Sequence, residues 1–486
     1  MPAGQNLLTP RQVNFIASTG GWVVKSGTLS LEPASTNALL GALAILPVTP
    51  AGPTSAFSGS PQNGGLTPAT PGALYSGTAN IQMTGSAEYV QAVVEFLDSS
   101  GKEITSVVGE ASDIEPGTWT PLVGALGIAP ANAVSTVLGV IAWNTSLGQE
   151  TAVADPSLTA STVHGAAAVT GPLTTAGNQI LDGNGKPLVL HGVQLSGLDD
   201  SPNLGSITED TVAQAKAWGA NMMRVSLGEQ YWLPSSCAFD ASYPSEVDQV
   251  VNWVTSLGMV AVLELSEFAV TPCGQAADYD MADSPGAVSF WNSVAARYAD
   301  NPLVAFDLYN EPHDISDSVW LNGGIAWDGL VPYSVAGMQQ LYSTVRAAGA
   351  KNLTFVSGNN WANSLPSTLV SGSNIAYGVH VYTCPSAAPP NCSNSDPYDP
   401  SPMLEPWVAP SATVPVIVSE FGWPSNSNST YNAAVIAFAQ AHGWGWNAFA
   451  WTVTAPWGLV ATDPAGGPYE PTVSGMPVLA ALAASP

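Results

Sequence analysis

Basic residues are scarce in this sequence. Nine lysines and arginines stand against 36 aspartates and glutamates, so the formal net charge of the 486 residues is -27. A field of that sign repels nucleic acid and anionic membrane surfaces, and we exclude both as partners. Charged residues of either sign make up only 9% of the chain. We therefore expect a surface of uncharged polar residues, which suits an exported protein that meets neutral polymers.

Long apolar runs and the features of a signal peptide are also missing. No uncharged apolar run reaches the roughly 18 residues of a membrane span. The start, M-P-A-G-Q, has neither a basic region nor an apolar core, so we expect that any signal peptide has been removed. We predict a secreted, extracellular protein without a membrane span.

Cysteines are few, and their spacing excludes a familiar metal site. Cys237, Cys273, Cys384 and Cys392 lack the tight Cys-x-x-Cys pairs of a zinc site. Three pairings are possible, and we expect two disulfides formed in an oxidising compartment. Cys384 and Cys392 would close a short loop, which leaves Cys237 to pair with Cys273.

The first 160 residues predict an all-β domain. They contain short runs rich in Val, Thr and aromatic residues, separated by Gly and Pro, and 88–97, 119–123 and 134–143 are the clearest. Their alternation of apolar and polar residues predicts a β-sandwich. The segment 47–72 is dense in Pro, Gly, Ser and Thr and predicts an extended loop. Residues 161–176 are small and featureless and predict a linker.

Residues 177–486 alternate predicted strands and helices. Eight strands separated by helices or long connections favour a (β/α)8 TIM barrel over an open sheet. The chain is long enough for such a barrel beside the sandwich. In this fold the functional side chains lie at the C-terminal ends of the strands.

Two of the predicted strands end in a glutamate. Residues 303–312, L-V-A-F-D-L-Y-N-E-P, place Asn310 and Glu311 after an apolar run, and residues 414–423, V-P-V-I-V-S-E-F-G-W, place Glu420 in the same way. One such glutamate alone is more simply a helix cap or a solvent-facing residue. A pair indicates function, because glutamate is a poor strand residue. Two carboxyl groups at one rim supply the acid and the anion that glycoside hydrolysis requires.

Further residues at predicted strand ends complete a pattern. The motifs N-E-P, H-V-Y at 380–382, S-E-F-G at 419–422 and a late Trp451 resemble the retaining (β/α)8 glycoside hydrolases. The set is most similar to glycoside hydrolase family 5, over residues 176–486. The resemblance implies a cellulase-like enzyme with Glu311 as acid/base and Glu420 as nucleophile, and it needs no metal or organic cofactor because the two carboxyl groups supply both proton and nucleophile.

The same resemblance implies supporting roles for five residues. The structural alternatives are an ordinary salt bridge for the arginine and an interior packed pair for the histidine and tyrosine. The implied roles are that Arg224 keeps the nucleophile ionised, Asn310 holds the 2-hydroxyl of the sugar, His380 joins the polar network, Tyr382 orients the nucleophile and Trp451 stacks on a sugar ring.

The third strand departs from the family. Many members carry a histidine at its end beside the reacting sugar, whereas this chain reads V-L-E-L-S-E-F and places Ser266 there, between Glu264 and Glu267. This difference bears on which sugar is bound more than on which reaction is catalysed.

The N-terminal domain has a softer resemblance. The order N-L-L, V-V-E-F-L-D-S-S-G, W-T-P-L and A-P-A-N-A is similar to jelly-roll carbohydrate-binding modules. A purely structural accessory sandwich is the alternative. Aromatic residues that either stack on sugars or pack in the core are Trp22, Tyr75, Tyr89, Trp119 and Trp143.

Other aromatic residues follow the predicted barrel strands. Trp232, Trp361, Trp423 and Trp457 are candidate sugar subsites, which favours an endo-acting enzyme on a polymer. We predict a monomer that binds β-glucan and cleaves β-1,4 chains of the cellulose type with retention. The alternatives are a β-mannanase or other β-glucanase, and a catalytically silent polysaccharide-binding protein.

Overall fold

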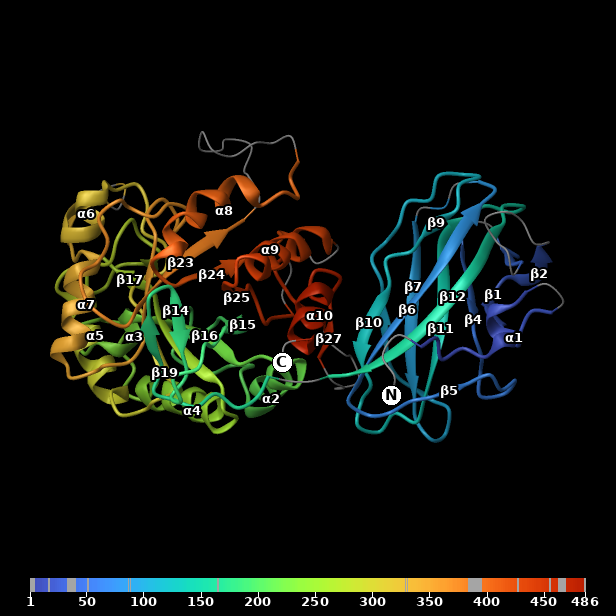
Figure 1. Ribbon diagram of the computed structural model, residues 1–486, viewed down its shortest axis with the longest axis horizontal. Helices are drawn as coiled ribbons and strands as arrows, with labels where there is room; N and C mark the ends of the chain where they lie inside the picture. The colour runs from blue at the N-terminus through green and yellow to red at the C-terminus, as the bar shows by residue number, and fades with distance from the viewer. Residues whose placement is uncertain are drawn as a thin grey trace. The chain divides into compact units, whose positions relative to one another are not determined.

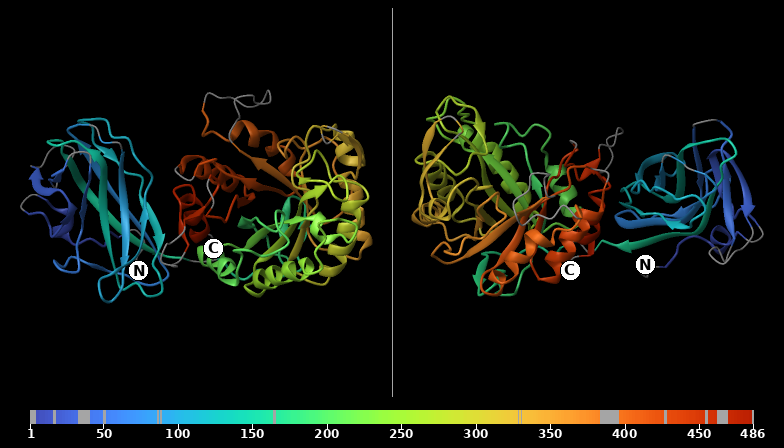
Figure 2. Two further views of the ribbon diagram at one scale, coloured as in Figure 1. Left: turned by 180° about the vertical axis from the view of Figure 1, so that it is seen from behind. Right: turned by 90° about the horizontal axis from the view of Figure 1, so that it is seen from above.

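The computed structural model describes residues 5–15, 18–32, 41–49, 52–85, 87, 89–163, 166–327, 329, 331–382, 396–425, 428–453, 456–461 and 469–484. These residues form two compact units (Figures 1 and 2). Unit 1 takes its residues from 1–164, 425–429 and 459–484. Unit 2 takes its residues from 165–424 and 430–458.

Unit 1 is an antiparallel β-sandwich. One sheet has the strand order β1-β4-β11-β7-β8 with β5 against β11, and the other has the order β10-β6-β12-β3-β2 with β9 against β6. Buried side chains such as Tyr75, Phe96 and Leu138 fill the core between them. The strands are β1 (Val23–Ser26), β2 (Thr28–Glu32), β3 (Ala42–Leu46), β4 (Gly52–Phe57), β5 (Thr67–Pro68), β6 (Ala73–Met83), β7 (Tyr89–Leu97), β8 (Glu103–Val108), β9 (Thr120–Pro121), β10 (Ala125–Ile128), β11 (Ser135–Thr145) and β12 (Thr151–Thr162), and the short helix α1 (Pro10–Val13) precedes them.

The segment predicted as one extended loop is partly a strand. Strand β4 lies within 47–72 and pairs with both β1 and β11. Its last four residues are buried, and Ala56 belongs to the core of the sandwich. The loop prediction is therefore wrong over β4 and β5, because burial and strand pairing outweigh a composition typical of loops.

The C-terminal segment belongs to unit 1. The structure places Leu459–Ala484 with the sandwich, whereas the sequence suggested one barrel domain to the end of the chain. The segment contains β26 (Val460–Ala461), β27 (Glu470–Pro471) and α10 (Met476–Ala484), and the last two lie against β10. Because α10 is apolar on all sides, it needs a covering surface wherever it packs.

Unit 2 is a closed barrel of eight parallel strands, which confirms the predicted (β/α)8 fold. Each strand pairs with the next around the ring, and β15 also pairs with β25 to close it. Strands β16, β23 and β24 are buried along their whole length, as parallel strands covered on both faces require. The ring consists of β15 (His191–Leu195), β16 (Met222–Gly228), β17 (Val260–Ala269), β19 (Val304–Asp307), β22 (Thr354–Ser357), β23 (Ile375–Val381), β24 (Val416–Phe421) and β25 (Gly445–Ala448).

Helices surround the barrel strands (Figures 1 and 2). Helix α2 illustrates how the local sequence sets their ends: Thr208 accepts a hydrogen bond from the Thr211 amide at its start, and Gly219 with φ 111° ends it. The helices of unit 2 are α2 (Glu209–Trp218), α3 (Glu229–Trp232), α4 (Tyr243–Ser256), α5 (Gly286–Tyr298), α6 (Asp317–Asn322), α7 (Met338–Ala347), α8 (Ser401–Val408), a short 3-10 turn η1 (Pro410–Ala412) and α9 (Thr430–Ala441). Short hairpin strands are β13 (Thr174–Ala176), β14 (Gln179–Leu181), β18 (Ala276–Ala277), β20 (Gly324–Trp327) and β21 (Pro332–Val335).

The predicted linker is largely part of unit 2. Val169 and Leu173 are buried in the apolar cluster at the base of the barrel, and the Val169 amide donates to the Gly258 carbonyl at 2.8 Å. Small side chains therefore reflect close packing here rather than mobility.

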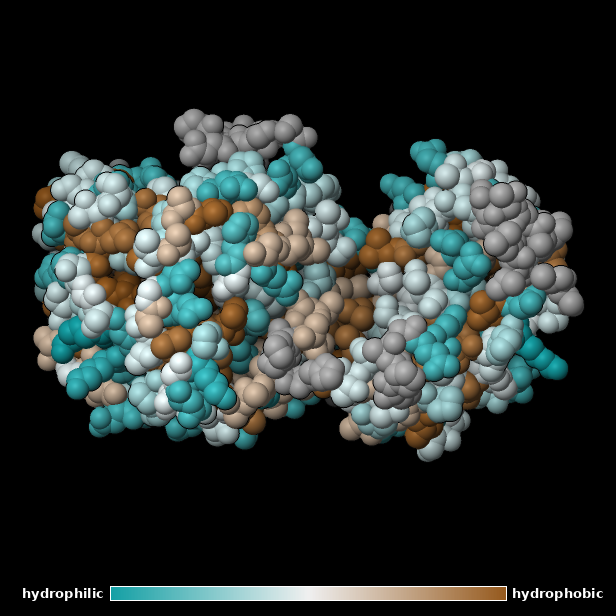
Figure 3. Space-filling model, in the orientation of Figure 1, coloured by the Kyte–Doolittle hydropathy of each residue, from teal (hydrophilic) through white to brown (hydrophobic). Residues whose placement is uncertain are grey.

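The surface agrees with the composition. Figure 3 shows pale residues of intermediate hydropathy over much of the visible face of each unit, with teal and brown residues interspersed. Among the described residues, no helix is both long and apolar enough to span a membrane.

Candidate active site

Two glutamates meet at the rim of the barrel. Glu311 follows β19 and Glu420 lies near the end of β24, and His380 stands between them on β23. The His380 Nδ1 atom is 2.7 Å from Glu311 Oε1 and 3.9 Å from Glu420 Oε2. One carboxyl oxygen of each glutamate and this nitrogen all lie within 4.8 Å of one another. The parallel strands thus bring together side chains that are 109 positions apart in the sequence.

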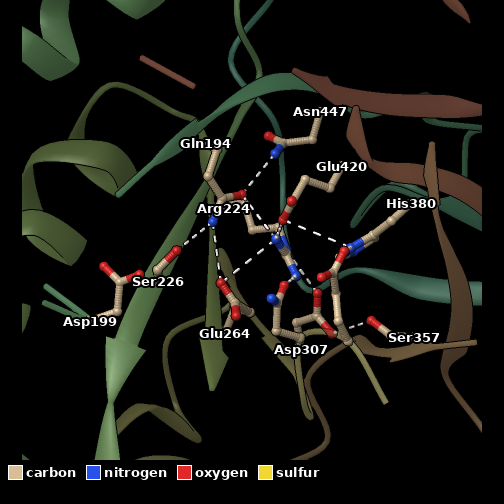
Figure 4. A network of polar contacts seen from close by, with 12 residues as sticks. Gln194, Asp199, Arg224, Ser226, Glu264, Asp307, Ser357, His380, Glu420 and Asn447 are labelled. Carbon is tan, nitrogen blue, oxygen red and sulfur yellow. Dashed lines mark hydrogen bonds and ion pairs between the residues drawn. The ribbon is translucent and has the colours of Figure 1, made fainter. Parts of the chain in front are cut away.

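Arg224 on β16 holds the centre of the site (Figure 4). Its buried guanidinium donates from Nη1 to Glu420 Oε2 at 2.7 Å and from Nε to Asp307 Oδ2 at 2.9 Å. The Nη2 atom donates to Asn310 Oδ1 at 3.0 Å. A fork of donors in fixed geometry thereby orients two carboxylates and an amide at once.

A ring of polar residues lies around Arg224 in the barrel interior (Figure 4). Gln194 accepts from Arg224 Nη1 at 3.1 Å and from Asn447 Nδ2 at 3.0 Å, and it donates to Ser226 Oγ at 2.6 Å and to Glu264 Oε2 at 3.2 Å. Our sequence reading did not assign Gln194, Asp307 or Asn447 to the site. The available signal was a polar residue inside an apolar strand, which is costly unless it is hydrogen-bonded.

The two glutamates ionise differently. Burial raises the pKa of Glu311 well above its usual value, and the nearby charge of Glu420 adds to the effect. Burial also opposes ionisation of Glu420. The positive charges of protonated His380 and of Arg224, together with the hydrogen bonds from Tyr382 and Arg224, outweigh burial, so the pKa of Glu420 is lowered. Burial lowers the pKa of His380 to about 4. The imidazole is therefore neutral at neutral pH, and Arg224 is the permanent cation beside Glu420. One carboxyl group is set to hold its proton and the other to lose it.

Aromatic residues cover the Glu420 side of the site. The Tyr382 hydroxyl donates to Glu420 Oε1 at 2.5 Å. The ring of Trp457 meets the Tyr382 ring edge-on at a centroid distance of 5.1 Å, and Phe449 lies at 6.4 Å. Phe449 and Trp457 are both partly exposed. Phe449 was not among the residues singled out from the sequence, since it sits in an apolar run with no distinguishing neighbour.

The structure does not bring every predicted aromatic residue to this group. Trp451 is 4% exposed and packs edge-on against Trp218 of α2, at a centroid distance of 4.7 Å. Trp232 is also buried, between Tyr243 and Phe290. Both side chains belong to the packing around the barrel, because large apolar rings gain most when fully buried.

The two remaining predicted aromatics are partly exposed. Trp361 is 45% exposed and stacks on His313 with a centroid distance of 3.4 Å. Trp423 lies beside Tyr398 and Tyr431. Together with Trp457, Trp361 and Trp423 remain open to a ligand.

One of the expected disulfides is present near this rim. Cys237 and Cys273 are bonded, with 4.9 Å between their Cα atoms. Cys384 and Cys392 lie outside the described residues.

Within the part of the chain that the structure describes, two groups of side chains have the composition of a cation site. In Glu311, His380 and Glu420, the guanidinium of Arg224 already neutralises Glu420, so a metal ion would compete with a fixed positive charge. In the second group, formed by Asp280, His313 and Asp314, the His313 Nδ1 atom is 2.7 Å from the Glu311 carbonyl oxygen.

Known proteins resemble unit 2. The model of the family described as "Cellulase (glycosyl hydrolase family 5)" matches residues 181–455, more than half of the chain. Endoglucanase 3 of Humicola insolens is 28% identical over 176 residues, which cover 34% of this chain and 40% of that protein. Endoglucanase gh5-1 of Neurospora crassa is 30% identical over 159 residues, which cover 32% of this chain and 36% of that protein. A β-glucanase from Saccharophagus degradans has a crystal structure with a TM-score of 0.48 and 19% identity, covering 64% of this chain and 93% of that one. The matches thus span well under half the length of these two curated relatives.

Proposed function

Because the chain belongs to glycoside hydrolase family 5, we propose that it is a retaining, endo-acting glycoside hydrolase that cleaves β-1,4-glucan of the cellulose type. The observation that carries the proposal is the close approach of Glu311 and Glu420, whose nearest carboxyl oxygens lie within 4.8 Å. Retaining enzymes hold these groups about 5 Å apart, whereas inverting enzymes leave room for a water molecule at about 6.5–9.5 Å.

In the first step of the proposed mechanism Glu420 attacks the anomeric carbon. Arg224 and Tyr382 keep its carboxylate ionised and aimed, through hydrogen bonds of 2.7 and 2.5 Å. Glu311 gives its proton to the glycosidic oxygen as the bond from that oxygen to the anomeric carbon breaks. The products of the step are a glycosyl ester on Glu420 and a free sugar hydroxyl.

The second step reverses these roles. Glu311, now ionised, takes a proton from water while the water oxygen attacks the anomeric carbon and Glu420 leaves. Two displacements restore the original configuration. Asn310, held by Arg224, is placed to bind the 2-hydroxyl during both steps.

Polymer binding is proposed for partly exposed rings in both units. In unit 2, Trp361, Trp423 and Trp457 offer faces to successive sugars, which favours internal cleavage of a chain. In unit 1, Tyr89 and Trp143 are directly opposite each other on β7 and β11, with ring centroids 5.9 Å apart. By contrast, Trp22 and Tyr75 are buried in the core. We propose that Tyr89 and Trp143 form a sugar-stacking platform of a carbohydrate-binding unit in an exported protein.

A panel of polysaccharides tests the proposed function. Carboxymethyl cellulose, β-1,3-glucan, mannan and xylan are incubated with the full chain, and the products are followed by size and by the anomer first released. We expect a rapid fall in the viscosity of carboxymethyl cellulose and the β-anomer as first product. A preference for mannan would shift the substrate, an α-anomer would contradict retention, and binding without cleavage would indicate a silent polysaccharide-binding protein.

A further inference from the structure

A hairpin extends from the barrel beside the proposed catalytic residues. Strand β17 pairs with β19 only through residues Ala261–Glu264 and then continues to Ala269. There it pairs with β18, with Phe268 opposite Ala277. The chain therefore turns back after Cys273. Asp278, which directly follows β18, lies again beside the rim residue Asn310.

The hairpin is fastened at its tip and at its return. At the tip, Cys273 is bonded to Cys237, and the Cys237 amide donates to the Pro272 carbonyl at 2.7 Å. At the return, the Tyr309 hydroxyl donates to the Tyr279 carbonyl, and the His313 amide donates to the Asp280 carbonyl at 2.9 Å. The residue between these anchors, Asp278, is held in place from both sides.

Asp278 contacts the site through Asn310. The Asn310 Nδ2 atom donates to Asp278 Oδ2 at 3.2 Å, while its Oδ1 atom accepts from Arg224. The main-chain amide of Asn310 donates to Leu265, next to Ser266 at the end of the third barrel strand. Asp278 thus lies at the rim, where the barrel portion of β17 and the segment that follows β19 are in contact.

Within the described part of the chain, one carboxyl oxygen of Asp278 lacks a hydrogen bond. Its Oδ1 atom is buried and accepts no hydrogen bond from the described residues, because the nearby Tyr309 hydroxyl donates to the Tyr279 carbonyl instead. Burial raises the pKa of Asp278 well above its usual value, and the nearby charge of Glu311 adds to this, which places the group close to the proposed acid/base. A buried, unpartnered carboxyl oxygen is costly unless a ligand completes it.

We propose that Asp278 is a sugar-binding residue of the subsite that holds the reacting ring. Its Oδ2 atom fixes the amide of Asn310, which leaves the second N–H of that amide for the sugar 2-hydroxyl. Its Oδ1 atom accepts a hydrogen bond from that same 2-hydroxyl, so both contacts depend on this one group of the ring. The inference rests on the proposed function for the identity of the ligand, a pyranose with a free 2-hydroxyl.

Matched substrates test this role in the full chain. Asp278→Ala and Asp278→Asn are compared with wild type on an aryl β-cellobioside and on its 2-deoxy counterpart, with Asp300→Asn, an exposed carboxylate, as the control for lost charge. We expect Asp278→Ala to lower kcat/KM about 10- to 100-fold on the first substrate and by less than about threefold on the second. Asp278→Asn keeps an acceptor for Asn310 and should lie between wild type and Asp278→Ala. An equal loss on both substrates, or no loss on either, overturns the proposal.

A binding measurement separates this proposal from the proposed function. Cellotetraose is titrated calorimetrically into Glu420→Ala and into the double variant Glu420→Ala/Asp278→Ala, neither of which turns over. At least tenfold weaker binding by the double variant supports the role of Asp278 even if the wild type proves to be a silent binder. Equal affinity overturns it, and unchanged thermal unfolding of the two proteins shows that the comparison is between folded molecules.

Discussion

Arg224 and Glu420 are joined by a hydrogen bond of 2.7 Å although 196 positions separate them in the sequence. Arg224 is 1% exposed and Glu420 is 6% exposed. The same guanidinium also contacts Asp307 and Asn310. Removing this cation would leave several buried acids without compensation, so its replacement is a severe test of the site.

We expect Arg224→Lys to lower kcat/KM by about 100-fold or more, because one ammonium group cannot reach all four hydrogen-bond partners of the planar guanidinium. Initial rates on carboxymethyl cellulose measure the loss. The matched control is Arg297→Lys, since Arg297 forms an exposed pair with Asp248 and its replacement should leave the rate within about twofold. Equal effects of the two substitutions would contradict the central role of Arg224.

Replacing the two glutamates tests which is the proposed acid/base and which the proposed nucleophile. Glu311→Ala and Glu420→Ala should each lower turnover by about 10³-fold or more while the protein stays folded. On an aryl glycoside with a good leaving group, added azide should restore Glu311→Ala and yield a β-glycosyl azide. Azide should also restore turnover of Glu420→Ala, but there the product should be an α-glycosyl azide. Near wild-type turnover in either variant, or the reverse pair of azide products, would contradict the assignment.

The hydroxyl of Tyr382 stabilises the ionised form of Glu420 at 2.5 Å. Because the proposed mechanism needs ionised Glu420 and protonated Glu311, the profile of kcat/KM against pH should be bell-shaped, with its acidic limb set mainly by Glu420. Tyr382→Phe removes a hydrogen bond to the anion, so the pKa of Glu420 rises and the acidic limb moves to higher pH.

The basic limb reports Glu311 and should stay in place in Tyr382→Phe. Tyr342→Phe serves as control, because Tyr342 donates to the Ser373 carbonyl away from the site. An unshifted acidic limb in Tyr382→Phe would show that this hydroxyl does not tune the nucleophile.

A second carboxyl pair in the barrel predicts a dependence of stability on pH. Burial raises the pKa of Glu229 well above its usual value, and the neighbouring Asp283, which caps α5, adds to the effect. A raised pKa in the folded state means that the folded protein holds a proton that the unfolded chain releases. The stabilisation is therefore complete below the ordinary glutamate pKa and is lost as pH rises through the folded-state value.

We expect the wild type to unfold at a lower temperature at about pH 8 than at about pH 5, and Glu229→Gln to reduce that difference. Differential scanning calorimetry at both pH values measures it. Glu405→Gln, an exposed glutamate on α8, should behave as wild type. A difference in Glu229→Gln as large as in wild type would exclude Glu229 as a source.

The ring pair on unit 1 predicts a substrate-dependent effect. Trp143→Ala should weaken adsorption to insoluble cellulose and lower activity on it several-fold. Stacking of sugar rings on a flat aromatic side chain contributes most where the polymer presents a solid surface. Activity on soluble carboxymethyl cellulose should not change. Trp119→Ala is the control, since Trp119 packs on the alanine cluster of the other sheet. Equal losses on both substrates would indicate a structural role for the pair.

The local pattern of the chain was sufficient for the barrel and for the central pair of glutamates. Parallel strands covered on both faces must be apolar along their length, and their C-terminal ends meet at one rim. A glutamate at the end of such a run therefore had one plausible destination. Arg224, Asn310, His380 and Tyr382 followed from the same rule. In the structure Arg224 and Tyr382 contact Glu420, His380 contacts Glu311, and Asn310 contacts Arg224.

Only the tertiary structure decided which side chains beyond the strand ends face that rim. Trp451 packs against α2 while Phe449, two residues earlier, lies beside Tyr382, because the path of the chain after β25 sets the direction of each ring. Asp278 lies in a loop without any pattern and reaches Asn310 only because the β17 hairpin turns back. Side-chain alternation specifies a face within a strand, whereas the course of a long connection depends on contacts between residues distant in the sequence.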